Sequence, residues 1–481
     1  MKRIKLNELQ KFFKNFLFKF LYSVISLIVG ILMTSYLSRT LEVDGFGKLN
    51  FLTTYASYFI FFTSLGMDIV ALRLISQDNN KATQILGTVI PIKFLLSILF
   101  FIIMLLPMLF LKKMQDYGLL VVIFSLPIII SSLSPQFVFE GTKRWEFPST
   151  INILHMIINL ILIYVFVRSK SDLPAIGVIS LALNFITILI SHVIVMYHHG
   201  LWKLKIDLSL SKDLLSQGII IGFIQIVAQF ISYIDIILLE FLSDNTSVGL
   251  YSAAYRAMFL TIGFILIIHN LMIPILSGSY NTNFNMYKKY LDKYMKLVIF
   301  VTFGISVILI ILAEPFLKMF YDLQKYQQSI ICFRILMLNL FFWAVNSPLN
   351  TGLIAVKKEK ILLYIVTFQL IANIIANFLL IPKYGIIGSS IATVITEAIG
   401  FPFYIYAFNK IHRSPIFKYL IIASASTIPV AFTVYFLQIH FIFRGLIGII
   451  VMIVFAILFR GYTINEILDI KKTFFNVEKA D

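Results

Sequence analysis

The chain has 481 residues, of which 59 % are apolar and only 13 % are charged, and its mean hydropathy is +0.93. Soluble domains are about 45–50 % apolar and about 25 % charged, so this composition excludes a water-soluble protein and a disordered chain. One cysteine cannot form an internal disulfide, which excludes a disulfide framework. The net charge of +17 does not by itself indicate nucleic acid, because its meaning depends on where the basic residues lie. The composition predicts a polytopic, all-α membrane protein.

Fourteen apolar segments are long enough to cross a membrane as helices, which takes about 20 residues each. The fourth is the least regular, because it carries Pro127 and Pro135. In chain order, the segments lie near residues 15–37, 49–67, 85–110, 117–136, 149–167, 175–196, 216–239, 249–275, 295–317, 328–348, 362–381, 386–408, 416–437 and 441–460.

The basic residues of the short connecting loops predict the orientation of the chain, since cytoplasmic loops are enriched in Lys and Arg. With the amino terminus inside, the inside loops and tails hold 26 of the 40 basic residues and the outside loops hold 10. We therefore expect both termini to be cytoplasmic. Most of the positive charge then sets the topology and lies near anionic lipid headgroups.

Two short patterns occur twice along the chain. A polar loop ends in an apolar residue and a glycine at Gly47, and again at Gly249, 202 residues later. A proline stands a few residues before Gly177 after the fifth segment and before Gly388 after the eleventh, and these two glycines are 211 residues apart. Glycine at helix starts also lets membrane helices approach closely, so either match alone would mean little. Together they predict a parallel repeat of six helices.

The repeat defines the predicted domains. We expect an N-terminal bundle over 1–210, a C-terminal bundle over 211–410, and two additional helices with a cytoplasmic tail over 411–481. Two bundles facing each other across a central cavity are typical of a transporter.

Four basic residues fall inside the predicted spans. An ionisable group there costs at least a few kcal/mol unless it faces protein or water, so each is a candidate site. Lys19 can extend its stem toward the membrane surface, whereas Lys93 lies deeper, just after Pro91. Arg256 and Arg334 can bind phosphate oxygens with two parallel hydrogen bonds. We take these four residues as candidate substrate-binding residues.

Two acidic residues inside the spans are candidates for coupling or for ion pairs. Asp235 and Arg256 lie on adjacent predicted helices, so a structural ion pair is the alternative role for both. Glu397 lies in the middle of its span and could bind a proton or a cation, or could pair with a basic residue.

The sequence contains no catalytic constellation. Its seven histidines are scattered, which does not favour a metal site, and it has no phosphate-binding loop for ATP. We expect neither an enzyme nor a bound cofactor or metal.

Three stretches resemble the start of each half of the bacterial polysaccharide-repeat-unit flippases. These are residues 38–47 (SRTLEVDGFG), residues 65–67 (LGM) followed by Arg73, and Asp235 followed by residues 247–256 (SVGLYSAAYR). The family consists of O-antigen translocases of the multidrug, oligosaccharidyl-lipid and polysaccharide exporter superfamily. The resemblance covers the whole chain in the number of spans, the loop sizes and the repeat.

The resemblance implies a multi-pass protein of the bacterial cytoplasmic membrane. It would move an anionic undecaprenyl-pyrophosphate-linked oligosaccharide from the cytoplasmic to the outer leaflet by alternating access, for O-antigen or capsule biosynthesis. Its partners would be membrane lipids, a coupling cation or proton, and a polysaccharide polymerase. Two alternatives remain: a multidrug exporter of the same fold, and a membrane glycan polymerase or ligase.

Overall fold

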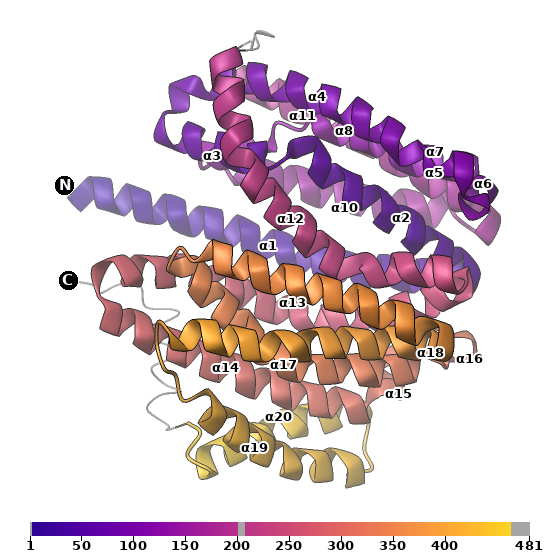
Figure 1. Ribbon diagram of the computed structural model, residues 1–481, viewed down its shortest axis with the longest axis vertical. Coiled ribbons are helices and arrows are strands. Elements are labelled where there is room, and N and C mark those ends of the chain that lie inside the picture. Colours follow the sequence, from indigo (N-terminus) through magenta and orange to yellow (C-terminus); the bar gives the residue numbers. More distant parts are fainter. Residues whose placement is uncertain (1, 201–206, 463–481) are drawn as a thin grey trace. The chain divides into compact units, whose positions relative to one another are not determined.

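The computed structural model describes residues 2–200 and 207–462, and these residues form helices connected by short turns (Figure 1). Among them, ten helices are long and apolar enough to cross a membrane, or eleven if a bent pair of helices counts as one span. The helices also expose large apolar side chains such as Leu189, Ile421 and Ile450. Such surfaces suit hydrocarbon and not water, so this is a multi-pass membrane protein.

The helices divide into two compact units, Met1–Ser252 and Ala253–Asp481. This division falls inside α13 (Asn245–Thr282). The domain boundary at residues 210/211 is predicted from the sequence repeat, and it stays a prediction. The helices of unit 1 are α1 (Lys2–Thr40), α2 (Glu42–Ser64), α3 (Met67–Gln77), α4 (Ala82–Leu105), α5 (Pro107–Phe110), α6 (Lys112–Tyr117), α7 (Leu119–Ser125), α8 (Pro127–Ser132), α9 (Gln136–Gly141), α10 (Glu146–Phe166), α11 (Leu173–His199) and α12 (Leu208–Leu242).

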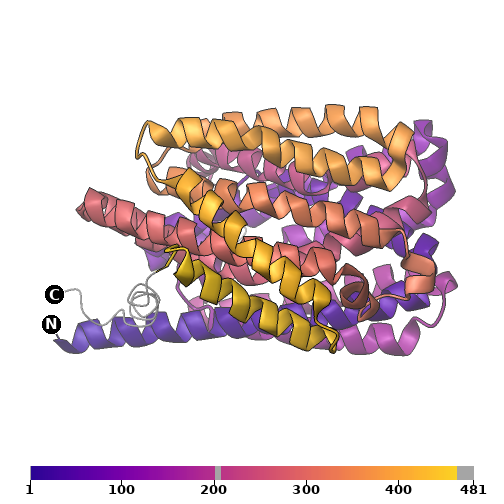
Figure 2. The same cartoon turned by 90° about the horizontal axis from the view of Figure 1, so that it is seen from below.

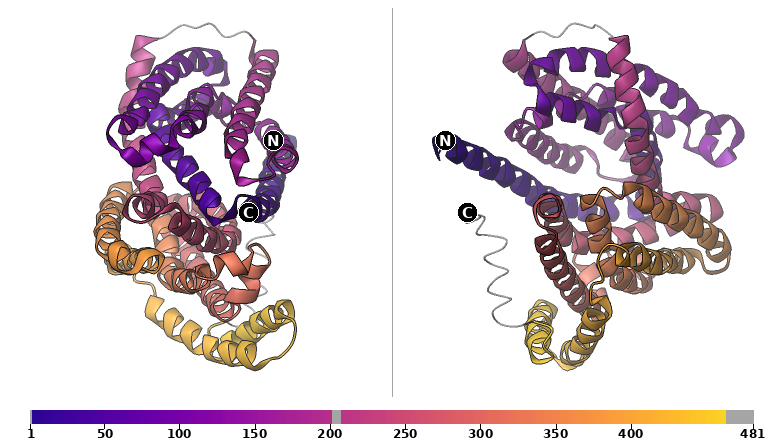
Figure 3. Two further views of the ribbon diagram at one scale, coloured as in Figure 1. Left: turned by 90° about the vertical axis from the view of Figure 1, so that its right-hand side faces the viewer. Right: turned by 60° about the vertical axis from the view of Figure 1, so that its left-hand side comes forward.

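Unit 2 is built around α17, which packs against α14 and α18. Its core contains large buried side chains from these helices and from α19, and the single cysteine, Cys332, is fully buried in α17. α19 and α20 form a hairpin at the end of the unit (Figure 2; Figure 3). After α13, the helices are α14 (Phe284–Ile311), α15 (Ala313–Lys318), α16 (Leu323–Tyr326), α17 (Ser329–Ala355), α18 (Glu359–Asn409), α19 (Ile416–Phe436) and α20 (Phe441–Leu458).

Each of the fourteen predicted segments lies in helical structure. That the chain crosses the membrane fourteen times stays a prediction. Two of the segments lie in α18, whose backbone breaks at Gly385 (φ 55°, ψ −129°), a conformation that glycine adopts readily. The irregular fourth segment is divided into α7 and α8 at Pro127, as proline at a first helical position permits. α2 and α3 meet at a 47° bend, where Gly66 has a positive φ.

Two glycines of the predicted repeat, Gly47 and Gly249, lie where the beginnings of α2 and α13 cross. A Cβ atom on Gly47 would lie 1.8 Å from the carbonyl oxygen of Asn245, and one on Gly249 would lie 2.2 Å from the carbonyl oxygen of Val43. Only glycine permits the two backbones to approach so closely. These two glycines therefore mark a close helix contact in unit 1, and the repeat stays a prediction.

Candidate functional site

Lys93 lies almost completely buried in α4, where it forms an ion pair with Asp68 of α3. Its Nζ lies 2.8 Å and 3.1 Å from the two carboxylate oxygens of Asp68, and 5.8 Å from the ring centre of Phe137. The lysine is 4 % exposed, whereas the Asp68 side chain is 38 % exposed. The predicted cation is thus present in the interior, and its charge is balanced by a carboxylate that the sequence reading did not select.

Lys19 belongs to the same charged region of unit 1. Its Nζ lies 3.5 Å from the ring centre of Trp145, within the range of a cation–π contact. Glu140 lies within electrostatic reach of both Lys19 and Asp68, and burial raises the pKa of its carboxyl. Gln136 donates a hydrogen bond of 2.9 Å to Glu140. The structure therefore brings Lys19 and Lys93 into one region, which we call the unit 1 charged cluster: Lys19, Asp68, Lys93, Glu140 and Trp145.

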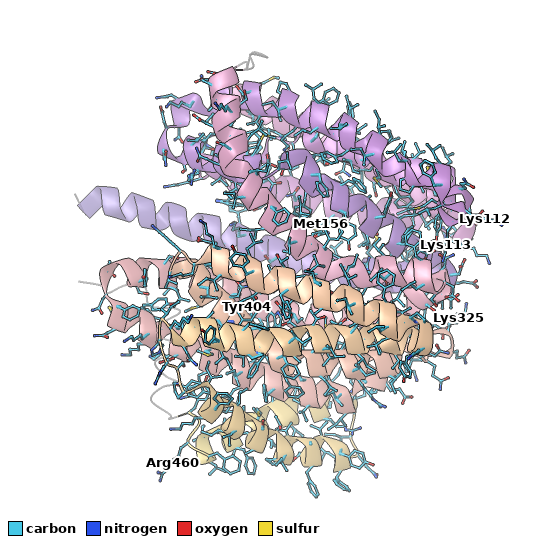
Figure 4. All side chains as sticks on the ribbon, viewed as in Figure 1. Lys112, Lys113, Met156, Lys325, Tyr404 and Arg460 are labelled. Carbon is cyan, nitrogen blue, oxygen red and sulfur yellow. The ribbon has the colours of Figure 1, made fainter. Side chains whose placement is uncertain are left out.

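A second buried carboxylate of unit 1, Glu240, lies at the end of α12. Lys113 forms an ion pair with it at 3.2 Å and also donates to its carbonyl oxygen. The hydroxyl of Tyr117 donates a hydrogen bond of 2.6 Å to the same carboxylate. Figure 4 shows Lys113 at one end of unit 1. This arrangement joins α6 to the turn between α12 and α13.

Asp235 is 2 % exposed in α12. The hydroxyl of Tyr251, in α13, donates a hydrogen bond of 2.7 Å to the Asp235 carboxylate. Arg256 has an exposed side chain in α13 and lies within electrostatic reach of Tyr321. Arg334 is also exposed, and its Nε donates to the carbonyl oxygen of Ile310 at 3.2 Å. The roles predicted for Asp235 and the two arginines stay predictions.

Glu397 lies in the second half of α18, among amide side chains. The Nδ2 of Asn346 donates hydrogen bonds to the Glu397 carboxylate at 2.6 Å and to the backbone carbonyl oxygen of Glu397 at 3.0 Å. The Nε2 of Gln369 donates a hydrogen bond of 3.2 Å to the carbonyl oxygen of Thr396 and lies close enough to the Glu397 carboxylate to interact with it. Gln369 lies against the bare backbone of Gly400, where a Cβ atom would lie 2.2 Å from its Nε2. A glycine one turn after the acid thus leaves room for the second amide.

An apolar groove of about 420 Å³ lies in unit 2, between α14, α17, α18 and α19. Its walls are mainly aromatic, and the rings of Phe303 and Phe341 meet edge to face with their centres 4.6 Å apart. The groove adjoins the Glu397 site, because Phe342 and Phe401 lie one helical turn from Asn346 and Glu397. Its lining residues are Phe303, Phe341, Phe342, Phe401, Leu420, Ser424 and Thr427.

The sequence reading missed the partners of the buried charges. Asp68 carried a usable signal, since it is an acid that directly follows the apolar segment 49–67 and the Gly66 break. Lys113 lies between two predicted spans, and nothing in the sequence links it to Glu240, which is 127 positions later. The amides that surround Glu397 carried no signal of their own, because Asn and Gln also occur in packed interiors.

Comparisons with known proteins identify the family. The family model described as "Polysaccharide biosynthesis protein" matches residues 12–279, more than half of the chain, and the MatE model matches residues 221–379. The "Putative O-antigen transporter" of Escherichia coli (strain K12) is 25 % identical over 230 residues, 47 % of this chain and 55 % of that protein. The "Lipid II flippase MurJ" of Thermosipho africanus (strain TCF52B) is 29 % identical over 200 residues, 40 % of this chain and 41 % of that protein. The chain thus spans about half of the length of these curated relatives.

Solved structures show the same fold over nearly the whole chain. The inward closed conformation of lipid II flippase MurJ has a TM-score of 0.71 at 19 % identity, and the match covers 92 % of this chain and 98 % of that one. An inward-facing multidrug resistance MATE family transporter of the MOP superfamily has a TM-score of 0.58 at 15 % identity, with 82 % and 96 % covered. The family resemblance seen in the sequence is confirmed. The chain belongs to the polysaccharide biosynthesis protein family and has the fold of the multidrug, oligosaccharidyl-lipid and polysaccharide exporter superfamily.

Proposed function

We propose that this protein is a flippase of the bacterial cytoplasmic membrane that moves an undecaprenyl-pyrophosphate-linked oligosaccharide from the cytoplasmic to the outer leaflet. The match of the polysaccharide biosynthesis model over more than half of the chain carries the proposal. The O-antigen repeat unit is the substrate that the 25 % identical relative suggests. The protein acts as a transporter and not as an enzyme, with alternating access as its mechanism.

The charges of the spans support an anionic substrate. Arg256 and Arg334 have exposed side chains on α13 and α17, and a guanidinium binds phosphate oxygens with two parallel hydrogen bonds. Lys19 is also exposed. Lys93, in contrast, is neutralised by Asp68, so we assign it a role in holding the unit 1 charged cluster and not a direct phosphate contact.

The groove of unit 2 supports a substrate with a long apolar tail. Four phenylalanines and a leucine line it, and burying an apolar chain against such a wall removes its surface from water. A free sugar or sugar nucleotide would gain little there.

Loss of the gene tests the function directly. Deletion cells should still synthesise the lipid-linked repeat unit, retain it on the cytoplasmic side, and display no polymer. If deletion stopped synthesis of the repeat unit itself, the protein would be an enzyme or part of a synthetic complex.

Arg256 tests the anionic part of the substrate. Arg256→Ala should abolish export at normal protein levels, whereas Arg256→Lys should retain part of it, since the charge survives without the bidentate geometry. The alternative is an ion pair with Asp235, in which case Arg256→Ala should destabilise the protein and Asp235→Ala should partly restore it. Full export by a stable Arg256→Ala protein would exclude the phosphate role.

A multidrug exporter is the second candidate, favoured by the MatE match over residues 221–379. It would require acidic residues for cationic drugs, and Glu397 is a half-buried acid inside a predicted span of unit 2. Drug sensitivity of deletion cells, with surface polysaccharide intact, would favour the exporter.

A further inference from the structure

The surroundings of Glu397 hold no balancing cation. Among the described residues, its polar contacts are the amides of Asn346 and Gln369, and no lysine, arginine or histidine forms an ion pair with it. Asn346 is 3 % exposed, and its Oδ1 atom is buried with no hydrogen-bond partner. The site therefore contains an acid, Glu397, with no positively charged partner. It also contains a hydrogen-bond acceptor, Asn346 Oδ1, with no donor.

An ionised carboxyl in such surroundings is costly. Burial of an unpaired charge in a low-dielectric interior is avoided in practice because the group becomes neutral. A protonated carboxyl can also donate a hydrogen bond, which an unpaired amide oxygen such as Asn346 Oδ1 can accept after a small rearrangement. Both features of the site are thus satisfied by one added proton.

A metal cation fits the site less well. The N–H group of Asn346 already uses an electron pair of the carboxylate that a cation would need, and the amide of Gln369 lies beside it. A site for a hard cation requires several oxygen ligands, whereas amide hydrogens directed at the only acid repel it. In the described part of the chain, no three His, Cys, Asp or Glu residues are grouped so that they could hold a metal.

The groups around the site leave its charge free to change. Tyr404, on the same helix, lies within electrostatic reach of Glu397 and is visible in unit 2 in Figure 4. The groove side presents phenylalanines, Leu420, Ser424 and Thr427, none of which titrates. Beyond α17, His269 contacts Ser347, the residue after Asn346, at 3.2 Å. Tyr404 and His269 are thus the titratable groups that these contacts place around the site.

We propose that the half-buried Glu397 carboxyl, with the amides of Asn346 and Gln369, is a proton-binding site of unit 2, and that its protonation is coupled to transport. The coupling rests on the proposed flippase function, but proton binding does not. Protonation forms an O–H bond on Glu397 with a proton from water, and no other bond changes.

Proton binding can be measured on the purified protein without substrate. Infrared difference spectra between about pH 8 and about pH 5 should show a protonated-carboxyl C=O band that is missing in Glu397→Gln. Glutamine has nearly the shape of the protonated acid, so this variant should fold. Glu397→Asp keeps a carboxyl and should retain the band at a shifted frequency. The control Glu314→Gln, which removes an exposed acid of α15, should not alter that band. An unchanged spectrum in Glu397→Gln would overturn the proposal.

Coupling can be measured in vesicles that contain the protein and a labelled undecaprenyl-pyrophosphate oligosaccharide. A pH gradient should raise the wild-type rate by at least about tenfold, and the Glu397→Gln rate should not respond to the gradient. An equal response of both proteins would disprove the coupling. If neither protein moved the lipid under any condition, the flippase proposal would fail while the infrared result would still decide proton binding.

Discussion

Two acids, Glu240 of unit 1 and Glu397 of unit 2, have different neighbours. In unit 1, Glu240 is matched by Lys113, and the buried cation Lys93 is matched by Asp68. In unit 2, Glu397 is surrounded by amides. A matched pair keeps both charges and holds helices together, because losing either partner leaves a charge in the interior. A carboxyl among amides can change its charge without disrupting its neighbours. We infer that the pairs of unit 1 are structural and that the acid of unit 2 is free to titrate.

The largest expected effect is at Glu240. Lys113→Met should lower the free energy of unfolding by about 3–5 kcal/mol, because Glu240 is fully buried and would lose its cation. The thermal stability of the purified protein in detergent measures this. The adjacent exposed lysine provides the control, so Lys112→Met should change little. The double variant Lys113→Met with Glu240→Gln should recover part of the loss; no recovery would show that the pair is not the cause.

A smaller loss is expected at Lys93. Asp68→Asn should cost about 3 kcal/mol, the lower end of the range for a broken buried pair, because part of the Asp68 side chain is exposed. Lys93→Met added to Asp68→Asn should restore stability, since methionine fills the same space without a charge. If the single variant were as stable as the wild type, the lysine would not depend on this carboxylate.

The amide site should be more tolerant. With Glu397 neutral, Asn346→Leu removes the hydrogen bonds to the carboxyl and to the backbone carbonyl oxygen of Glu397 and should cost about 1–2 kcal/mol. A loss as large as that of Lys113→Met would mean that Glu397 is ionised and that Asn346 stabilises its charge. In that case the contrast between the two units would disappear.

The smallest effect is at the surface of unit 1. Asp207 accepts hydrogen bonds from the hydroxyl of Ser209 and the N–H groups of Ser209 and Leu210 at the start of α12. The Ser209 hydroxyl is the main reason that the pKa of Asp207 is lowered. A lowered pKa stabilises the fold above the ordinary value of 3.8, and this contribution is lost as the pH falls through that value and below it.

Asp207→Ala should therefore lower the melting temperature by no more than about 2 °C at neutral pH, and the difference from the wild type should shrink below about pH 4. Asp213→Ala, an exposed acid of the same helix that does not cap it, serves as the control. A difference that persisted at low pH would show that the charge of Asp207 is not what stabilises the cap.

The helices could be predicted from the sequence, because the hydrocarbon imposes both length and apolar composition on each span. The match between Gly47 and Gly249 coincides with a backbone crossing that leaves no room for a side chain, and the repeat itself stays a prediction. The pairs could not be found, since Lys93 and Asp68 lie on different helices and hydropathy does not specify how a helix is rotated about its axis. For the same reason, the sequence selected Glu397 as a buried acid and left its amide neighbours unidentified.

The fully buried Cys332, the only cysteine of the chain, has a practical consequence. A thiol reagent that cannot enter the core finds no other sulfhydryl group on the native protein, so no cysteine-free background has to be constructed. A cysteine introduced at Asn285 or at Ser171, both exposed, would be the one rapidly reacting position. If the amino terminus is cytoplasmic, impermeant reagents added to intact cells should label Ser171→Cys and not Asn285→Cys. The orientation of the chain can therefore be mapped with single cysteine variants of the native sequence.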